Sequence, residues 1–317
     1  MDRITSSLLQ EYVVSEELTR LDEATQFEHF TGYLVTSKHY TETFSSYDIA
    51  TGSGGDSAID TLAIIVNGSL VTDSIEIEDL ESTNGYLDVT MVFNQAERSQ
   101  GFDSAKIGQF GFGVRDFMSE APTLVQNEAI KKKSEIITEI LKRSSKFTKG
   151  NPKCHLYYCT SGKWENDQNI VARLEAERNS TEDLGLFREV TFQPIGASKI
   201  QNLYIQSKNA ISREIVFSQR TTLPDLPNVE EAYIGFLSGP EYLKLIETED
   251  GDIITSIFYD NIRHWQDWNP VNKEIRNTLI NQSKRPYFPL FNNGITIIAK
   301  EIRATGNRFT IEPKYPK

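Results

Sequence analysis

The spacing of hydrophobic positions predicts helices at the start of the chain and strands after them. Residues 5–38 carry apolar side chains near helical spacing, which predicts one or two amphipathic helices. An apolar run at 62–66 then leads into Asn67-Gly68, a strong signal for a tight turn between strands. Residues 73–85 are acidic and predict a solvated loop before a second strand-like run at 87–95. We therefore expect an early antiparallel meander.

Helical and strand-like segments alternate in the middle of the chain. Helices are expected over 101–118, 122–146, 167–178 and 198–210, and strands over 154–160 and 188–195. This alternation predicts an α/β layer with crossover connections. The fold class we expect is α/β, with a mixed sheet flanked by helices.

A second unit is expected after a proline-containing, weakly apolar segment at 218–231, which has the composition of a linker. We place the first domain at 1–222 and the beginning of a second α/β domain at 223–317. The second unit has strand-like residues at 233–237, a helix near 240–248 and a last strand at 308–313. Its alternation of strands and helices is unfinished at Lys317, so we expect a shortened or incomplete second domain.

Polar side chains are expected at the tip of a buried sheet face. Leu87, Val89, Met91 and Phe93 alternate along the second strand, and Gln95 and Glu97 continue the same face. Asp60 opens the preceding strand. Carboxylate and amide oxygens are the ligands that Mg²⁺ or Mn²⁺ prefers, so these three residues form a candidate metal site.

A purely structural interpretation of the same residues stays open. Asp56 and Asp60 follow glycines in a segment that favours turns and caps, and Gln95 can cap a strand end. The four histidines have no ligand spacing, which excludes a zinc motif. The glycine-rich TGSGGDS lacks the lysine of a phosphate-binding loop, and no serine-nucleophile motif occurs.

The charge balance narrows the possible partners. A formal charge of −12 and a pI near 5.0 argue against nonspecific coating of nucleic acid, but a local basic patch can still bind it. The clearest basic segment is the predicted helix at 122–146 and its end, where Lys131, Lys132 and Lys133 are consecutive. A solvated helix face and a phosphate-contacting surface remain equal alternatives for this segment.

Two features suggest the compartment. Cys154 and Cys159 are predicted to point to opposite faces of one strand, so a mutual disulfide is not expected. No apolar run approaches the roughly 18 residues of a membrane span, and the N-terminal residues do not resemble a leader peptide. We expect a soluble cytoplasmic protein without a membrane partner.

Two stretches resemble known families. The residues YDNIR (259–263), VN (271–272) and FNNGITIIA (291–299) resemble the start of the abortive-infection phage-resistance (AIPR) domain. The stretches IDTLAIIVNG, VFNQAERS and FDSAKIGQF resemble the nuclease-like module that precedes that domain in many members, which belongs to the PD-(D/E)XK superfamily of restriction-type nucleases. The resemblance implies a restriction-endonuclease-like fold and Mg²⁺-dependent cleavage of nucleic acid, DNA more than RNA, in defence against phage.

The resemblance assigns roles to individual residues. Asp60 matches the metal-binding aspartate and Gln95 the first member of the acid-X-Lys or Gln-X-Lys couple, whereas Glu97 stands where lysine is expected. Among nearby cations we favour Lys106, on the next helix, over Arg98, which points to the opposite face of a regular strand. Arg98 is expected to bind nucleic acid together with the three consecutive lysines. Glu28 in the first helical segment matches an acid that several relatives carry there.

The departure at Glu97 leaves two functions open. One is a metal-dependent nuclease that uses Asp60, Gln95, Glu97 and Lys106, with Mg²⁺ or Mn²⁺ as cofactor. The other is a catalytically inactive module that binds nucleic acid or a partner protein as a sensor. A homo-oligomer or a partner protein of the defence system is a further expectation.

Overall fold

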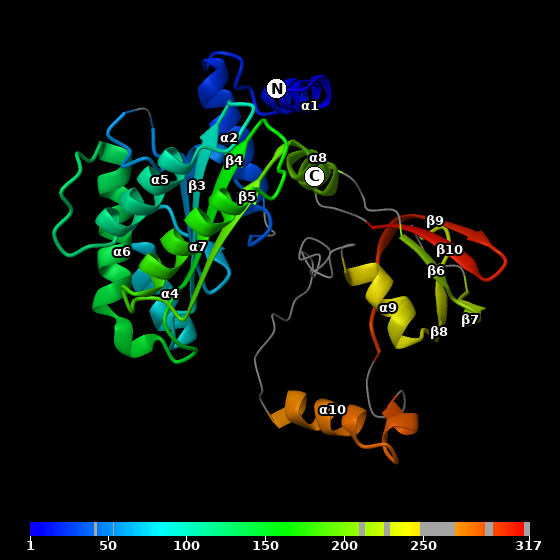
Figure 1. Ribbon diagram of the computed structural model, residues 1–317. Helices are drawn as coiled ribbons and strands as arrows, with labels where there is room; N and C mark the ends of the chain where they lie inside the picture. Colours follow the sequence, from blue (N-terminus) through cyan, green and yellow to red (C-terminus); the bar gives the residue numbers. More distant parts are fainter. Residues whose placement is uncertain are drawn as a thin grey trace. The chain divides into compact units, whose positions relative to one another are not determined.

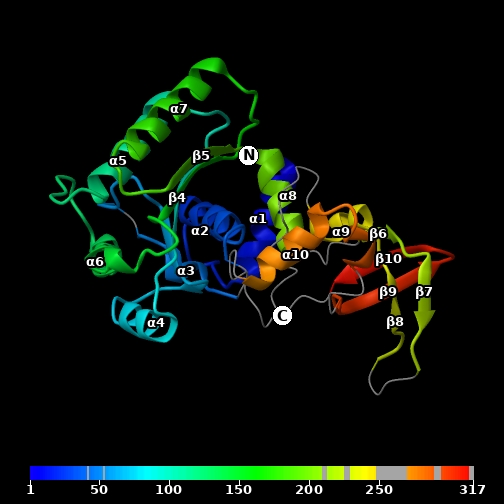
Figure 2. The ribbon, with the colours of Figure 1, turned by 90° about the horizontal axis from the view of Figure 1, so that it is seen from below.

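The computed structural model describes residues 1–40, 43–52, 54–208, 213–224, 229–247, 270–288 and 294–313. The chain divides into two compact units, Met1–Lys208 and Asn209–Lys317. Figure 1 labels most of their helices and strands, and Figure 2 gives a second view. The domain boundary that we placed after residue 222 lies inside the second unit. No helix in the described ranges is long and apolar enough to cross a membrane.

The first unit is built on a mixed five-stranded sheet in the order β2-β1-β3-β4-β5. β1 is antiparallel to both β2 and β3, whereas β3, β4 and β5 run parallel. This sheet, flanked by helices, confirms the predicted α/β fold class. The strands are β1 (Thr61–Val66), β2 (Ser69–Leu70), β3 (Val89–Glu97), β4 (Lys153–Thr160) and β5 (Glu189–Ile195).

Helices cover both faces of the sheet (Figure 2). One face packs against α1 (Arg3–Ser15), α2 (Glu23–Thr36), the short α3 (Ser46–Ile49) and α8 (Ala197–Lys208). The other packs against α4 (Glu76–Asn84), α5 (Ser104–Phe117), α6 (Glu128–Lys142) and α7 (Gln168–Glu182); the 3₁₀ helix η1 (Ser144–Lys146) follows α6.

Side-chain alternation assigns each strand residue to one of two cores. In β3, Val89, Met91 and Phe93 enter the core on the α5 side, whereas Val92 and Ala96 enter the core on the α2 side. The same alternation sends Cys154 and Cys159 of β4 to opposite faces, where both are buried free thiols, as predicted.

Two expectations for the region between the first strands were wrong. The acidic segment at 73–85 forms α4 rather than a loop, because Ile77 is buried on the helix and Gly85 ends it in a left-handed conformation. β3 pairs with β1, not with the shorter β2, so the three strands are antiparallel neighbours but not a meander. The tight turn at Asn67-Gly68 does connect β1 to β2, and both residues have positive φ.

The second unit contains a small antiparallel sheet in the order β6-β10-β9 and a separate β7-β8 hairpin. Its core includes Ile215, Leu245, Phe309 and Ile311. The segment expected to be a linker instead contributes β7. The elements are β6 (Arg213–Val216), β7 (Gln219–Thr222), β8 (Tyr233–Phe236), α9 (Gly239–Ile246), α10 (Pro270–Ile280), η3 (Arg285–Tyr287), β9 (Ala299–Thr305) and β10 (Arg308–Pro313).

Candidate active site

Asp60 lies buried at the beginning of β1, beside the carboxyl end of β3. Its N–H donates to the Asn94 carbonyl at 2.9 Å, and its side-chain Oδ2 accepts the Ala96 N–H at 2.6 Å. Thr61 pairs with Asn94 in the sheet, so continuing that register by one residue sets Asp60 against Gln95. The side chain is 7% exposed. Strand pairing therefore brings together two residues that are 35 positions apart in the sequence.

Gln95 and Glu97 continue the β3 face that packs against α5. The Oε1 atom of Gln95 is buried and has no hydrogen-bond partner among the described residues. Glu97 is partly exposed, and its Oε2 is 2.5 Å from the Nζ of Lys106 in the first turn of α5. Arg98 points the other way and pairs with Glu23 of α2 at 2.6 Å.

Two carboxyl groups at this edge have strongly raised pKa values. Burial, then the charges of Asp56, Asp22 and Glu97, raise the pKa of Glu28 to about 7. Burial raises the pKa of Asp60 well above its ordinary value, and the charge of Glu28 adds to the effect while the Ala96 N–H opposes it. The acids predicted from three separate segments thus act on one another electrostatically.

Asp56 also belongs to this electrostatic group, although its sequence context suggested only a turn. It raises the pKa of both Glu28 and Asp60. The loop that carries it is held by Asn127, whose N–H donates to the Gly55 carbonyl at 2.8 Å. α5 also approaches closely, because a Cβ at Gly113 would overlap the carbonyl oxygen of Ser57. A sequence signal did exist, since Asp56 and Asp60 flank the approach to β1 from a glycine-rich segment.

The donor atoms at this edge suit a hard divalent cation. They are carboxylate and amide oxygens, and the unpartnered Gln95 Oε1 is a free acceptor. In the described ranges, no group of three or more His, Cys, Asp or Glu side chains is placed to hold a metal ion. A cation would therefore draw on at most two carboxylates, with Gln95 and water supplying further oxygens. That small protein contribution is usual for Mg²⁺.

The basic helix predicted to contact nucleic acid is α6, and its three consecutive lysines have different environments. Lys133 is 5% exposed and donates to the Asp48 carbonyl at 2.7 Å, while burial lowers its pKa to about 8. The ammonium points into the protein, which argues against the predicted contact of Lys133 with nucleic acid. Lys131 and Lys132 are exposed, and Lys131 pairs with Glu128 at 2.7 Å.

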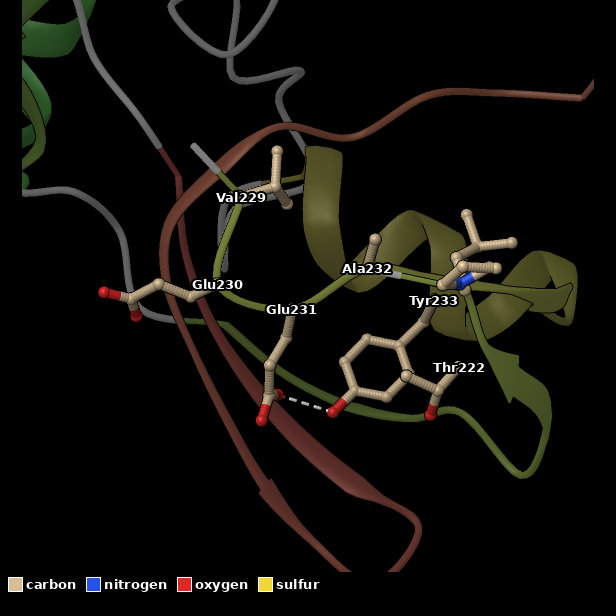
Figure 3. Close-up of a pocket in the computed structure, with 8 residues that line it drawn as sticks. Thr222, Val229, Glu230, Glu231, Ala232 and Tyr233 are labelled. Carbon is tan, nitrogen blue, oxygen red and sulfur yellow. Dashed lines mark hydrogen bonds between the residues drawn. The ribbon is translucent and has the colours of Figure 1, made fainter. Parts of the chain in front are cut away.

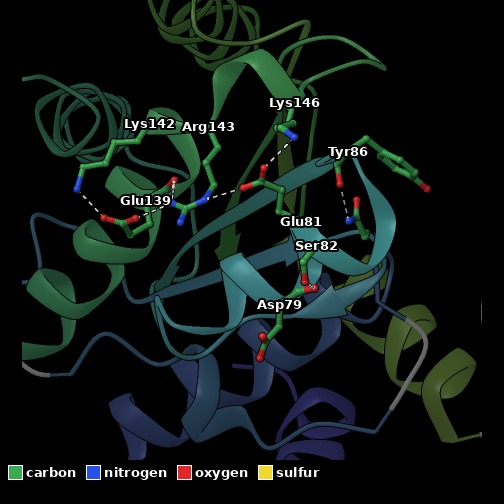
Figure 4. Close-up of polar contacts among 9 residues, drawn as sticks. Asp79, Glu81, Ser82, Tyr86, Glu139, Lys142, Arg143 and Lys146 are labelled. Atoms are coloured by element: carbon green, nitrogen blue, oxygen red, sulfur yellow. Dashed lines mark hydrogen bonds and ion pairs between the residues drawn. The ribbon is translucent and has the colours of Figure 1, made fainter.

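Acidic side chains compensate the basic end of α6 (Figure 4). Arg143 lies between Glu81 of α4, at 3.0 Å, and Glu139 of α6, at 2.5 Å. Lys142 also pairs with Glu139, and Lys146 with Glu81. The acidic segment expected to be a solvated loop thus supplies a carboxylate to the basic segment. These contacts favour the solvated, ion-paired alternative over a phosphate-contacting surface at this end of the helix.

Two concave regions lie near described loops. A groove of about 610 Å³ follows the carboxyl ends of β3 and β4, where Phe102 and Trp164 meet edge to face with ring centroids 4.8 Å apart. The second unit has a smaller pocket of about 140 Å³ (Figure 3), beside which the Tyr233 hydroxyl donates to Glu231 at 2.6 Å. The larger groove adjoins the Glu97–Lys106 pair, since its lining includes residues 103–105 at the start of α5.

Comparison with known proteins identifies part of the second unit. Residues 258–314 match the family model described as AIPR protein. This match confirms the resemblance for those residues and supports a role in abortive-infection phage defence. Of the motif residues, 259–263 and 291–293 lie outside the described ranges, whereas Val271 and Asn272 belong to α10. No curated protein and no solved structure matches the chain.

Proposed function

We propose that the chain is a metal-dependent nuclease of an abortive-infection defence system, hydrolysing phosphodiester bonds in DNA or RNA. The observation that carries this proposal is the convergence of Glu28, Asp60 and Glu97 at one sheet edge. Burial and then the charge of Glu28 raise the pKa of Asp60, and the charge of Glu97 adds to the raised pKa values of both Asp60 and Glu28, beside the unpartnered amide oxygen of Gln95. Neighbouring carboxylates with strongly raised pKa values are typical of functional sites. The AIPR match supports the biological setting.

Four residues carry the proposed chemistry. Asp60 and Gln95 hold Mg²⁺ or Mn²⁺, with Glu97 as a further oxygen ligand or as the base that removes a proton from the attacking water. Lys106, released from Glu97, neutralises charge on the phosphate in the transition state. The cation, when bound, supplies Lewis-acid stabilisation of the phosphoryl oxygens. Glu28, on α2, acts on the site through its charge, which raises the pKa of Asp60.

The test is cleavage of supercoiled plasmid, linear DNA and single-stranded RNA by the purified chain with Mg²⁺, Mn²⁺ or chelator. We expect metal-dependent cleavage that falls at least about 100-fold in Asp60→Asn, which removes a metal-binding carboxylate, and in Lys106→Met, which removes the positive charge that stabilises the reacting phosphate. Lys142→Met is the matched control, since Lys142 also pairs with a glutamate 2.5 Å away but lies on α6. Equal cleavage by wild type and Asp60→Asn would show that this is not the active site.

The alternative is a nuclease-like module that binds nucleic acid without cutting it. The exposed Lys131 and Lys132 are the observation that favours it. This module would bind DNA or RNA with the same affinity in the presence and absence of chelator. The double variant Lys131→Gln/Lys132→Gln would weaken binding and reduce its salt dependence. Lys133 is not included in this test, because it is buried and its substitution would change the stability of the protein.

A further inference from the structure

Tyr158 occupies the strand position next to Gln95. Gln95 and Tyr158 are paired in the parallel β3–β4 register, and both belong to the sheet face that packs against α5. Tyr158 has no exposed surface, and its hydroxyl has no hydrogen-bond partner among the described residues. With Asp60 set against Gln95 from the other side, three polar side chains line up across β1, β3 and β4.

The surroundings of this hydroxyl keep it protonated. Burial, followed by the charges of Glu97, Asp103 and Asp60, raises the pKa of Tyr158. A phenol can donate one hydrogen bond, and this one stands in a site otherwise dominated by acceptors. The aromatic ring of Phe102, at the edge of the adjoining groove, lies 6.1 Å from the Tyr158 ring, centroid to centroid.

Leaving such a donor unpaired is unfavourable for the protein alone. A buried polar group without a partner loses its hydrogen bonds to water and gains none in return, whereas phenylalanine would fill the same space without that penalty. The preceding residue, Tyr157, shows the usual arrangement: on the opposite face of β4, its hydroxyl is 2.7 Å from Nε2 of His39. The two tyrosines differ because the hydroxyl of Tyr158, unlike that of Tyr157, still has a hydrogen bond to donate.

We propose that Tyr158 is a positioning residue of the site, whose hydroxyl donates to a water carried by the divalent cation, beside Gln95. The inference rests on the proposed metal site and extends it to β4. Two unpartnered groups of opposite kind, an acceptor on Gln95 and a donor on Tyr158, are suited to hold one small oxygen ligand between neighbouring strands. The supporting side chains around a metal commonly fix its ligands in this way.

The experiment compares wild type with Tyr158→Phe, using Mn²⁺ as the probe. Mn²⁺ affinity is measured by titrating the electron paramagnetic resonance signal of the free ion, and thermal unfolding is recorded with and without Mn²⁺. We expect Tyr158→Phe to raise the melting temperature of the metal-free protein by about 2–4 °C, because an unpaired hydroxyl is removed. We expect the same change to weaken Mn²⁺ binding by about 10-fold.

Tyr157→Phe is the matched control, because it removes a paired hydroxyl from the same strand. It is expected to lower the melting temperature and to leave Mn²⁺ affinity unchanged. If wild type and Tyr158→Phe bind Mn²⁺ equally, the role of Tyr158 is wrong although the metal site stands. If wild type binds no Mn²⁺, or Asp60→Asn binds it as tightly, the metal site is wrong and the role of Tyr158 is lost with it.

Discussion

The raised pKa of Glu28 makes a quantitative prediction about stability. The pKa rises from an ordinary 4.5 to about 7 in the folded protein, so the native state holds this proton more tightly than the unfolded chain. Between pH 4.5 and 7 the native state therefore binds more protons, and its stability falls as pH rises. Below pH 4.5 the Glu28 side chain is protonated and does not lower the stability of the native state. Above pH 7 it is charged, and the native state carries the full loss of stability.

The magnitude follows from the size of that rise. A pKa increase from 4.5 to about 7 corresponds to about 3 kcal/mol. Solvent reaches part of the Glu28 side chain and screens its neighbours, so we expect roughly half of this, about 1.5 kcal/mol. Glu28→Gln should accordingly stabilise the metal-free protein by about 1.5 kcal/mol at pH 8 and have almost no effect near pH 4.5, because a neutral amide then replaces a neutral acid.

Urea unfolding of both proteins from pH 4.5 to 8, with chelator, measures this difference. The comparison is needed because buried histidines act in the opposite direction: burial lowers the pKa of His39 to about 2 and of His155 to about 4. These histidines stabilise the native state as pH rises. The effect is the same in wild type and Glu28→Gln, so it cancels in the difference between their free energies of unfolding. Glu23→Gln, on the exposed end of the same helix, is the control. A stabilisation by Glu28→Gln that is equal at both pH limits, or a loss of stability at pH 8, would refute the reasoning.

Two further predictions concern packing around α5. Gly113→Ala should destabilise the protein by about 1–3 kcal/mol in thermal unfolding, because the added methyl overlaps the Ser57 carbonyl; Gly101→Ala, which has open space, should not. A harmless Gly113→Ala would show that the loop at 54–58 yields easily. Glu177→Gln should lower the free energy of unfolding in urea by about 1–3 kcal/mol, since it removes a buried carboxylate that pairs with two partly exposed arginines. The exposed Glu182→Gln should lose less than about 1 kcal/mol, and equal losses would contradict this account.

Strand alternation was sufficient to predict the polar end of β3. The odd positions from Val89 to Phe93 do enter one core, and Gln95 and Glu97 do follow on the same face, because the two-residue period needs no knowledge of the partner strands. The preference for Lys106 over Arg98 as the cation near Glu97 used the same rule. The structure brings Lys106 to Glu97 and turns Arg98 toward Glu23, although the chemical role of Lys106 stays a prediction.

Other features depended on pairings that local patterns do not reveal. α4 was expected to be a loop because its acidic residues dominate the segment, but burial of Ile77 and an ion pair from Glu81 to the end of α6 stabilise it as a helix. The burial of Lys133 likewise depends on the Asp48 carbonyl, far away in the sequence. Tyr158 could not be linked to Gln95 in advance, because the parallel register of β3 and β4 is a long-range property.

The Glu97–Lys106 ion pair changes the meaning of the departure from the nuclease pattern. The acid-X-Lys couple requires one carboxylate and one ammonium at the end of a strand, and here β3 supplies only the carboxylate. The ammonium comes instead from the first turn of α5, where the Asp103 cap fixes the start of the helix and therefore the position of Lys106. Under the proposed function the two charges of the couple are both present, supplied by different elements. A lysine missing from the strand is therefore a weak argument for an inactive protein, and loss of function on changing Lys106 is the stronger criterion.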